Sequence, residues 1–193
     1  MTVATKILCF AGSLRKDSFN KKLAKLAATK AEAAQATVTY VDLKDYPMPI
    51  YDGDIEASEG IGDNAKKIKA LMKDHQGFII SCPEYNSSIT PVLKNTIDWA
   101  SRPLEGEKGL ECFKGKVVAL FAASPGKLGG LRGLVTVRAI LESIGVICIP
   151  DQFSVAMAQE AFDSDGNLKD AKQMAEVERI SKRLVEVTTL LNK

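Results

Sequence analysis

Residues able to hold a flat, polar molecule gather in Pro83–Ile89, a short segment rich in Tyr, Asn and Ser. It follows the apolar run Gly77–Ile80, which lies between Gly and Pro and is typical of a buried strand. Thr90 and Pro91 then favour the N-cap and first position of a helix. Open α/β sheets bind ligands in loops of this kind, at the carboxyl ends of strands. Pro83–Ile89 is therefore a candidate ligand loop, with an ordinary strand–helix turn as the alternative.

A second loop, Gly12–Asn20, has the composition of a phosphate site. It follows the apolar run Lys6–Ala11 and precedes a helix expected to reach about Ala36. Arg15 carries a permanent charge with forked donors that suit phosphate, and a helix N-terminus adds backbone N–H groups. Neither GxGxxG nor GxxxxGK[ST] is present, which excludes a Rossmann or Walker loop. The alternative is a capped helix start beside a solvated Arg-Lys pair.

The elements that must position these loops alternate between strand and helix five times. Such alternation predicts a parallel sheet with helices on both faces and right-handed crossovers. We expect one domain over residues 1–193, in the flavodoxin-like, doubly wound order 2-1-3-4-5. The expected strands are Lys6–Ala11, Thr37–Leu43 at an edge, Gly77–Ser81, Val117–Ala123 and Val146–Ile149, the last ended by Pro150.

A third loop, Ser124–Gly130, is rich in Gly and follows the strand Val117–Ala123. In the order 2-1-3-4-5 the strands that carry the three loops are neighbours, with the reversal between the first and third strands. The first loop suits a phosphate, and the other two suit a flat polar heterocycle beside it. Together these features describe FMN.

The sequence offers few residues for catalysis or metal binding by histidine or cysteine. The only histidine, His75, stands between a helix and the amino end of a strand, so a hydrolase triad and a zinc site are both disfavoured. The four cysteines are scattered without a CxxC motif, which indicates free thiols in a reducing cytoplasm. We therefore assign no catalytic acid–base residue and no metal.

Composition narrows the function classes further. The chain has 193 residues, 46% of them hydrophobic, and a formal net charge of +2. This balance gives no electrostatic case for nucleic acid, and no stretch resembles a secretory signal or a membrane span.

At this point the sequence resembles a known family, the NAD(P)H-dependent FMN reductases of flavodoxin-like fold, which include bacterial quinone and chromate reductases. The motifs that carry the resemblance occur in order over nearly the whole chain. They are Gly12-Ser-Leu-Arg-x-x-Ser-x-Asn20, Pro83-Glu-Tyr-Asn86, Leu93-Lys-Asn-x-x-Asp-Trp99, Gly126–Gly130 after Ser124, and the turn Asp163–Leu168. The third loop departs from the pattern because Pro125 removes a backbone donor.

The resemblance implies that the three loops hold different parts of the cofactor. The FMN phosphate would be held by the first loop, and the isoalloxazine ring by backbone groups of the second loop and by one residue of the third. The implied phosphate residues are Ser13, Arg15, Ser18, Phe19 and Asn20, and the implied ring residues are Pro83, Glu84, Tyr85, Asn86, Ser87 and Ser124.

The family also implies ping-pong chemistry, in which NADPH or NADH passes hydride to the flavin and leaves before an acceptor enters the same pocket. Quinones, azo dyes, free flavin and metal oxyanions such as chromate all remain open as acceptors, and Lys127 and Arg102 are candidates for attracting anions. Relatives pair as homodimers or dimers of dimers, for which Trp99, Arg102 and Arg132 are candidate contacts. Two other functions remain open: a flavodoxin-like electron carrier and a non-enzymatic sensor of a phosphate ligand.

Overall fold

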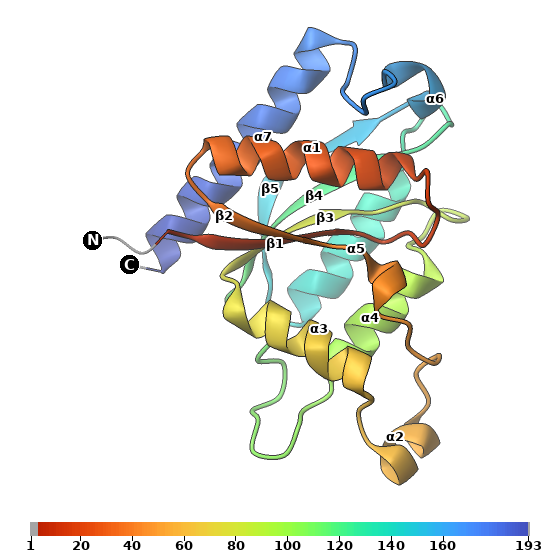
Figure 1. The fold of residues 1–193 in the computed structure, drawn as a ribbon, viewed down its shortest axis with the longest axis vertical. Coiled ribbons are helices and arrows are strands. Elements are labelled where there is room, and N and C mark those ends of the chain that lie inside the picture. Colours follow the sequence, from red (N-terminus) through yellow and green to blue (C-terminus); the bar gives the residue numbers. More distant parts are fainter. Residues whose placement is uncertain (1–3, 193) are drawn as a thin grey trace.

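The computed structural model describes residues 4–192, which form a five-stranded parallel sheet in the order β2-β1-β3-β4-β5 (Figure 1). The predicted order is thus confirmed, with β2 at one edge. The strands are β1 (Lys6–Ala11), β2 (Thr37–Val41), β3 (Gly77–Ser81), β4 (Val117–Ala123) and β5 (Ile147–Val155). In Figure 1 the carboxyl ends of β1 and β3 point to the right, toward the start of α1.

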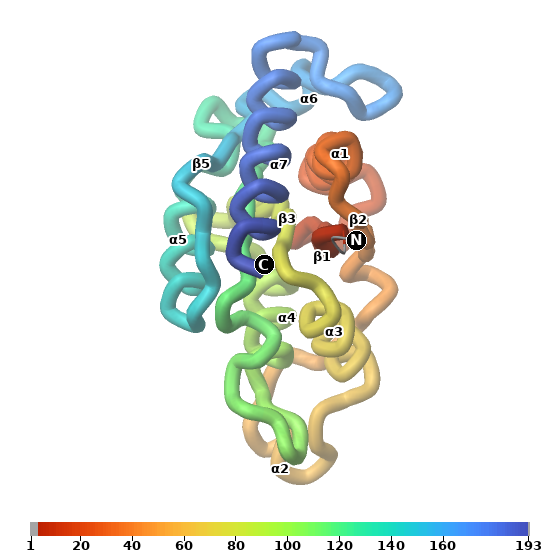
Figure 2. Tube along the Cα trace, turned by 90° about the vertical axis from the view of Figure 1, so that its left-hand side faces the viewer, coloured from red at the N-terminus to blue at the C-terminus, as the bar shows by residue number. Residues whose placement is uncertain are grey.

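Helices cover both faces of the sheet, as the views in Figures 1 and 2 show. Helices α1 (Phe19–Ala33) and α7 (Ala171–Leu191) pack together on one face, and α3 (Asp63–Asp74), α4 (Pro91–Ser101) and α5 (Leu131–Ser143) cover the other. Each face of the sheet packs a hydrophobic core against its helices, and successive strand residues point into opposite cores. Cys9 and Ile79 face α1 and α7, whereas Phe10 and Ile80 face α3 and α4. Both faces are therefore apolar, which explains why the inner strands lack polar alternation.

The predicted end of the last strand at Pro150 is wrong. Strand β5 continues to Val155 through an irregularity, where Val118 pairs with Cys148 but Leu120 pairs with Gln152. Three residues of β5, including Pro150, thus stand opposite one residue of β4, and this bulge lies in an edge strand, where the missing N–H of proline is tolerated. Helix α6 (Ala158–Ala161) then follows the strand.

Two long connections pack against α3 and α4. The first runs from η1 (Leu43–Asp45) to α2 (Gly53–Glu59), and side-chain N–H groups of α3 and α4 hold it by its proline carbonyls. Asn64 donates to the Pro47 oxygen, while Asn95 and Trp99 both donate to the Pro49 oxygen, each at 2.8 Å.

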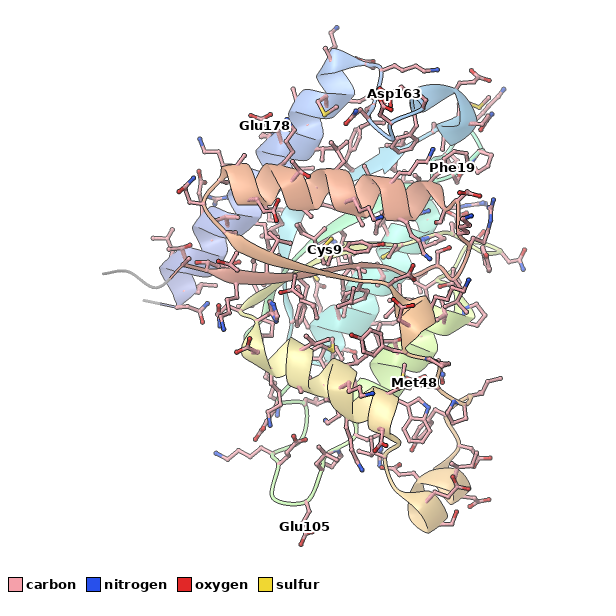
Figure 3. The ribbon with its side chains drawn as sticks, viewed as in Figure 1. Cys9, Phe19, Met48, Glu105, Asp163 and Glu178 are labelled. Atoms are coloured by element: carbon pink, nitrogen blue, oxygen red, sulfur yellow. The ribbon has the colours of Figure 1, made fainter. Side chains whose placement is uncertain are left out.

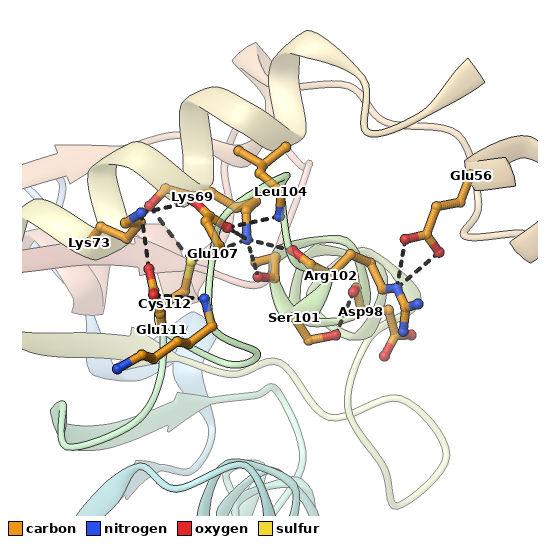
Figure 4. A network of polar contacts seen from close by, with 12 residues as sticks. Glu56, Lys69, Lys73, Asp98, Ser101, Arg102, Leu104, Glu107, Glu111 and Cys112 are labelled. Carbon is orange, nitrogen blue, oxygen red and sulfur yellow. Dashed lines mark hydrogen bonds and ion pairs between the residues drawn. The ribbon is translucent and has the colours of Figure 1, made fainter. Parts of the chain in front are cut away.

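The second connection, residues 102–116, is held by a network of charges (Figure 4). Lys69 is 3% exposed, and its Nζ lies 2.6 Å from the Arg102 oxygen and 3.1 Å from Glu107. Lys73 pairs with both Glu107 and Glu111. These lysines lie on α3, which leads into the amino end of β3, so this connection is fastened away from the ligand loops.

Two kinds of feature are absent within residues 4–192: a membrane-spanning helix and a cluster of metal ligands. No helix in this range has the length and apolar character needed to cross a membrane, and no three His, Cys, Asp or Glu residues gather as a metal site. His75 ends α3, with its ring nitrogens 2.6 Å from the Leu71 oxygen and 2.8 Å from Thr39 Oγ1. It lies at the amino end of β3, as predicted.

Candidate functional site

The loops after β1 and β3 lie side by side and are joined at Gly12. Its N–H donates to the Ser81 oxygen at 2.9 Å, and its carbonyl accepts from Thr90 Oγ1 at 2.7 Å. Thr90 also caps α4 by accepting from the N–H of Leu93, so the predicted N-cap is confirmed. A Cβ on Gly12 would lie 2.9 Å from the Cβ of Leu93, so a side chain at this position would push the first loop away from α4.

The start of α1 has the features of an anion site. Ser18 is the N-cap residue, but its nearly buried side chain makes no capping hydrogen bond, and the first turn holds no acidic residue. Ser13 is also buried, and its hydroxyl accepts weakly from the Arg15 N–H at 3.3 Å. Arg15 is exposed, and no ion pair forms to it within residues 4–192. Free hydroxyls, a free guanidinium and helix N–H groups fit a phosphate.

Phe19 has a different environment from the other first-loop residues. Its ring stacks on that of Phe162, with the centroids 5.9 Å apart and the planes inclined by 11°. Figure 3 shows Phe19 at the start of α1, on the side of the molecule where Asp163 also lies. Because its ring packs on the segment after α6, a contact between Phe19 and a phosphate would come from its backbone N–H.

Asn20 also turns inward. It is 3% exposed, and its Nδ2 donates to the Ala123 oxygen at 2.7 Å. Its Oδ1 accepts from the Ala123 N–H at 3.0 Å and from Ser81 Oγ at 2.9 Å. The carboxamide that the family motif assigns to the phosphate therefore joins α1 to the carboxyl ends of β3 and β4.

The second loop ends in a tight, exposed turn. Tyr85 and Ser88 exchange two backbone hydrogen bonds of 2.9 and 3.0 Å, and between them Asn86 and Ser87 have φ angles of 50° and 65°. Two consecutive left-handed residues are the mark of a type I′ turn. The turn leaves Tyr85 51% exposed, while Pro83 at its base is buried.

Glu84 reaches from the second loop to the first turn of α5. Its Oε2 accepts from the backbone N–H groups of Arg132 and Gly133 at 3.0 and 3.2 Å, and its Oε1 accepts from Arg132 Nε at 2.7 Å. The carboxylate thus supplies the helix with the cap that Gly130 lacks. Because these contacts occupy both carboxylate oxygens, only the backbone of Glu84 is left to face a ring.

The third loop is braced by the end of β5. Ser124 donates its N–H to the Val155 oxygen and accepts from the Ala158 N–H, and its hydroxyl accepts from the Gly126 N–H at 3.2 Å. Gly129 has a φ of 63°, and a Cβ there would lie 2.8 Å from the backbone nitrogen of Ala156. The glycine lets the loop lie flat on the strand end, with Lys127 exposed at its tip.

The thiols of Cys9, Cys82 and Cys148, in or beside the strands of the sheet, are not nucleophiles. Burial raises the pKa of the Cys82 thiol far above its ordinary value, and it does the same for Cys9, whose sulfur donates to the Ala24 oxygen. Cys148 is half-buried, and burial raises its pKa to about 11. All three are protonated at neutral pH, so nucleophilic chemistry is not available to them.

Two residues singled out from the sequence lie elsewhere. Arg102, a candidate for attracting anions, follows the far end of α4, where its Nε donates to Glu56 at 2.9 Å. Trp99, a candidate interface residue, is 2% exposed and packs in the core against Tyr51. Conversely, no motif points to Ser81 or Phe162, since each acts through a partner distant in the sequence.

Comparison with known proteins decides the family. Residues 5–160 match the family described as NADPH-dependent FMN reductase. The chain belongs to this family. It is an oxidoreductase, with FMN as the expected cofactor and NAD(P)H as the expected co-substrate, and the resemblance seen in its motifs is confirmed.

Relatives of similar length support this assignment. The chain is 32% identical to a 2-hydroxy-1,4-benzoquinone reductase of Burkholderia sp over 86% of each chain, and 31% identical to a quinone reductase of Pseudomonas putida over 88% of each. Among solved structures, FerB, a flavoenzyme NAD(P)H:(acceptor) oxidoreductase from Paracoccus denitrificans, matches with a TM-score of 0.77 and 28% identity. That match covers 96% of this chain and 97% of FerB.

Proposed function

We propose that this chain uses bound FMN to transfer electrons from NAD(P)H to quinones. The observation that carries the proposal is the pairing, at the β1–β3 switch point, of a loop suited to phosphate with an exposed loop suited to a ring. Quinone reductases among the relatives support quinones as the acceptor class. Exposed Lys127 on the third loop supports metal oxyanions such as chromate as secondary acceptors.

The first loop would hold the phosphate through Arg15, Ser13, Ser18 and the N–H groups at the start of α1. The backbone of the turn at Tyr85–Ser88 would lie along the ring, with Ser124 near its other edge. FMN, when bound, supplies the hydride-accepting and electron-donating chemistry. The residues of this chain bind and orient it and leave one face open, since Tyr85 and Lys127 are both exposed.

A ping-pong order follows if both substrates use that open face in turn. Steady-state rates measured with varied NADPH at several fixed benzoquinone concentrations should then give parallel double-reciprocal lines. Intersecting lines would contradict the shared face.

The role of Lys127 in attracting anionic acceptors is tested with Lys127→Ala. Arg102→Ala is the matched control, because Arg102 is bound to Glu56 away from the loops. Only the Lys127 change should raise the KM for chromate.

We propose that two copies pair through the exposed side of α5. Leu131 and Val135 are 43% and 64% exposed and lie about one helical turn apart on α5, and Leu128, 51% exposed, lies in the loop just before the helix. Light scattering should give the mass of two or four chains, and Val135→Glu should give single chains. Leu190→Glu, at an equally exposed site on α7, should not change the mass. A single-chain mass for the unaltered protein would contradict the pairing.

We also propose that the protein works in the cytoplasm, where its cysteines stay reduced. All four are free: Cys9, Cys82 and Cys112 are buried and Cys148 is partly buried. Thiol titration of the denatured protein purified without reductant should find four thiols. Fewer than four would contradict a reducing compartment.

A further inference from the structure

We propose that Asn20 is a positioning residue that fixes the three ligand loops relative to one another, with Ser81 as its partner. Asn20 lies in the first turn of the helix after the first loop, Ser81 ends the strand before the second loop, and Ala123 ends the strand before the third. One buried carboxamide bonds to both of the other residues. The inference rests on the proposed function because it assigns these loops to one cofactor.

The backbone of β4 explains why an amide is needed at this position. Pairing between β3 and β4 ends where Ser81 lies opposite Phe121, and the Cys82 N–H donates to the Phe121 oxygen at 2.7 Å. The chain then leaves the sheet at Pro83, while β4 continues to Ala123. Both Oδ1 and Nδ2 of Asn20 pair with the backbone of Ala123, as a neighbouring strand would. Buried backbone groups left unpaired would destabilise this edge.

The same contacts limit what Asn20 can offer a ligand. Its Oδ1 already accepts from the Ala123 N–H and from the Ser81 hydroxyl, which fills both lone pairs. One Nδ2 hydrogen is bound to the Ala123 oxygen, so a single N–H remains. By contrast, the side-chain donors of Arg15 and Ser18 have no acceptor among residues 4–192. Asn20 therefore acts on the cofactor mainly through the loops that it joins.

The first test uses the protein without FMN, where a ligand contact plays no part. Asn20→Ala and Ser81→Ala are compared with Ser181→Ala, which deletes an equally buried serine hydroxyl in α7. Amide hydrogen exchange at Ala123 should quicken at least tenfold in Asn20→Ala, since its N–H loses its acceptor. It should quicken less in Ser81→Ala and stay unchanged in Ser181→Ala. Unchanged exchange in Asn20→Ala would overturn the proposal.

The second test measures FMN affinity and the visible circular dichroism of bound FMN. Ser81→Ala removes one hydrogen bond and should therefore weaken FMN binding about fivefold to tenfold. This loss would be indirect, because the Ser81 hydroxyl is buried. Adding Ser81→Ala to Asn20→Ala should weaken FMN binding no further, because the bond between the two side chains is already absent. At saturating FMN the ring bands should change in Ser81→Ala but not in Arg15→Ala. Full additivity, or unchanged bands in Ser81→Ala, would overturn the positioning role.

The two tests separate the failure of this inference from the failure of the proposed function. If the unaltered protein takes up no FMN, the proposed function fails, and hydrogen exchange alone decides whether Asn20 joins the loops. If Asn20→Ala does not fold, Ser81→Ala carries both tests, because it removes one bond and leaves both groups of Ala123 paired.

Discussion

Glu84 and Arg132 are joined twice: Arg132 donates its backbone N–H to one carboxylate oxygen of Glu84 at 3.0 Å and its side-chain Nε to the other at 2.7 Å. The second ligand loop is thereby fastened to the helix that follows the third. The side chain of Glu84 is 7% exposed, whereas that of Arg132 is 57% exposed. The buried carboxylate is therefore the member of the pair whose loss should cost most.

Glu84→Ala should lower the free energy of unfolding by about 1–3 kcal/mol, because it uncaps α5 and leaves backbone N–H groups without an acceptor. Glu84→Gln keeps one carbonyl oxygen and should lose less. Urea unfolding followed by circular dichroism measures both variants. The control is Glu105→Ala, because the exposed side chain of Glu105 points away from the molecule at the tip of a loop (Figure 3). This change should alter the free energy of unfolding by less than about 0.5 kcal/mol. Equal losses in Glu84→Ala and Glu105→Ala would contradict the capping role.

Arg15→Ala should weaken FMN binding by about 1.5–3 kcal/mol, the usual contribution of a hydrogen bond to a charged group. The loss should shrink in high salt, because Arg15 is exposed and its charge is screened. Fluorescence titration of the FMN-free protein measures the affinity. Arg183→Ala removes another exposed arginine, on α7, and should leave the affinity unchanged. A full flavin complement and unaltered affinity in Arg15→Ala would mean that the first loop does not hold the phosphate.

Gly12→Ala should destabilise the protein by about 1–3 kcal/mol, because the added methyl meets Leu93 and overpacks the base of the first loop. It should also weaken FMN binding, since the loop must shift to relieve the contact. Gly53→Ala is the matched control: the residue begins α2, and within residues 4–192 the added Cβ would meet no atom within 4 Å beyond its chain neighbours and its own helix. Thermal unfolding of both variants without FMN tests the packing. An equally stable Gly12→Ala protein would contradict it.

Acid should loosen the connection at residues 102–116. Hydrogen bonds from Lys73 and from the Leu104 N–H, together with Lys69, lower the pKa of Glu107 from 4.5 to about 2. A carboxylate with a lowered pKa in the folded protein stabilises it fully above pH 4.5, and this contribution is lost as the pH falls toward 2. Urea midpoints at pH 6 and pH 3 should therefore differ more in the unaltered protein than in Glu107→Gln. Glu105→Gln should behave like the unaltered protein, and an unchanged pH dependence in Glu107→Gln would contradict the assignment.

Much of the fold follows from local pattern. Apolar runs such as Val117–Ala123, alternating with amphipathic helices, predict a parallel sheet, and the three loops then fall on neighbouring strands. Thr90 and Pro91 mark the start of α4 because capping depends on adjacent residues. Pro150 misleads because its tolerance depends on lying in a bulge of an edge strand, which local sequence does not reveal.

The direction in which a loop side chain points was less predictable. Phe19 and Asn20 stand where the family motif places them, yet Phe19 stacks on Phe162 and Asn20 pairs with Ala123. Both partners come from segments far along the chain, and they reach these positions only once the sheet has formed. Composition marks Gly12–Asn20 as a candidate ligand loop, but it does not show which of the loop's hydrogen-bond donors are left for a ligand.

The most direct test of the proposed function is an anaerobic absorbance spectrum of the purified protein, loaded with FMN if necessary, before and after addition of NADPH. We expect flavin bands that bleach with NADPH and return when benzoquinone is added to the same cuvette. Flavin bands that NADPH leaves unchanged would contradict the reductase function and indicate an electron carrier. A protein that neither contains nor takes up FMN would contradict the proposed cofactor site itself.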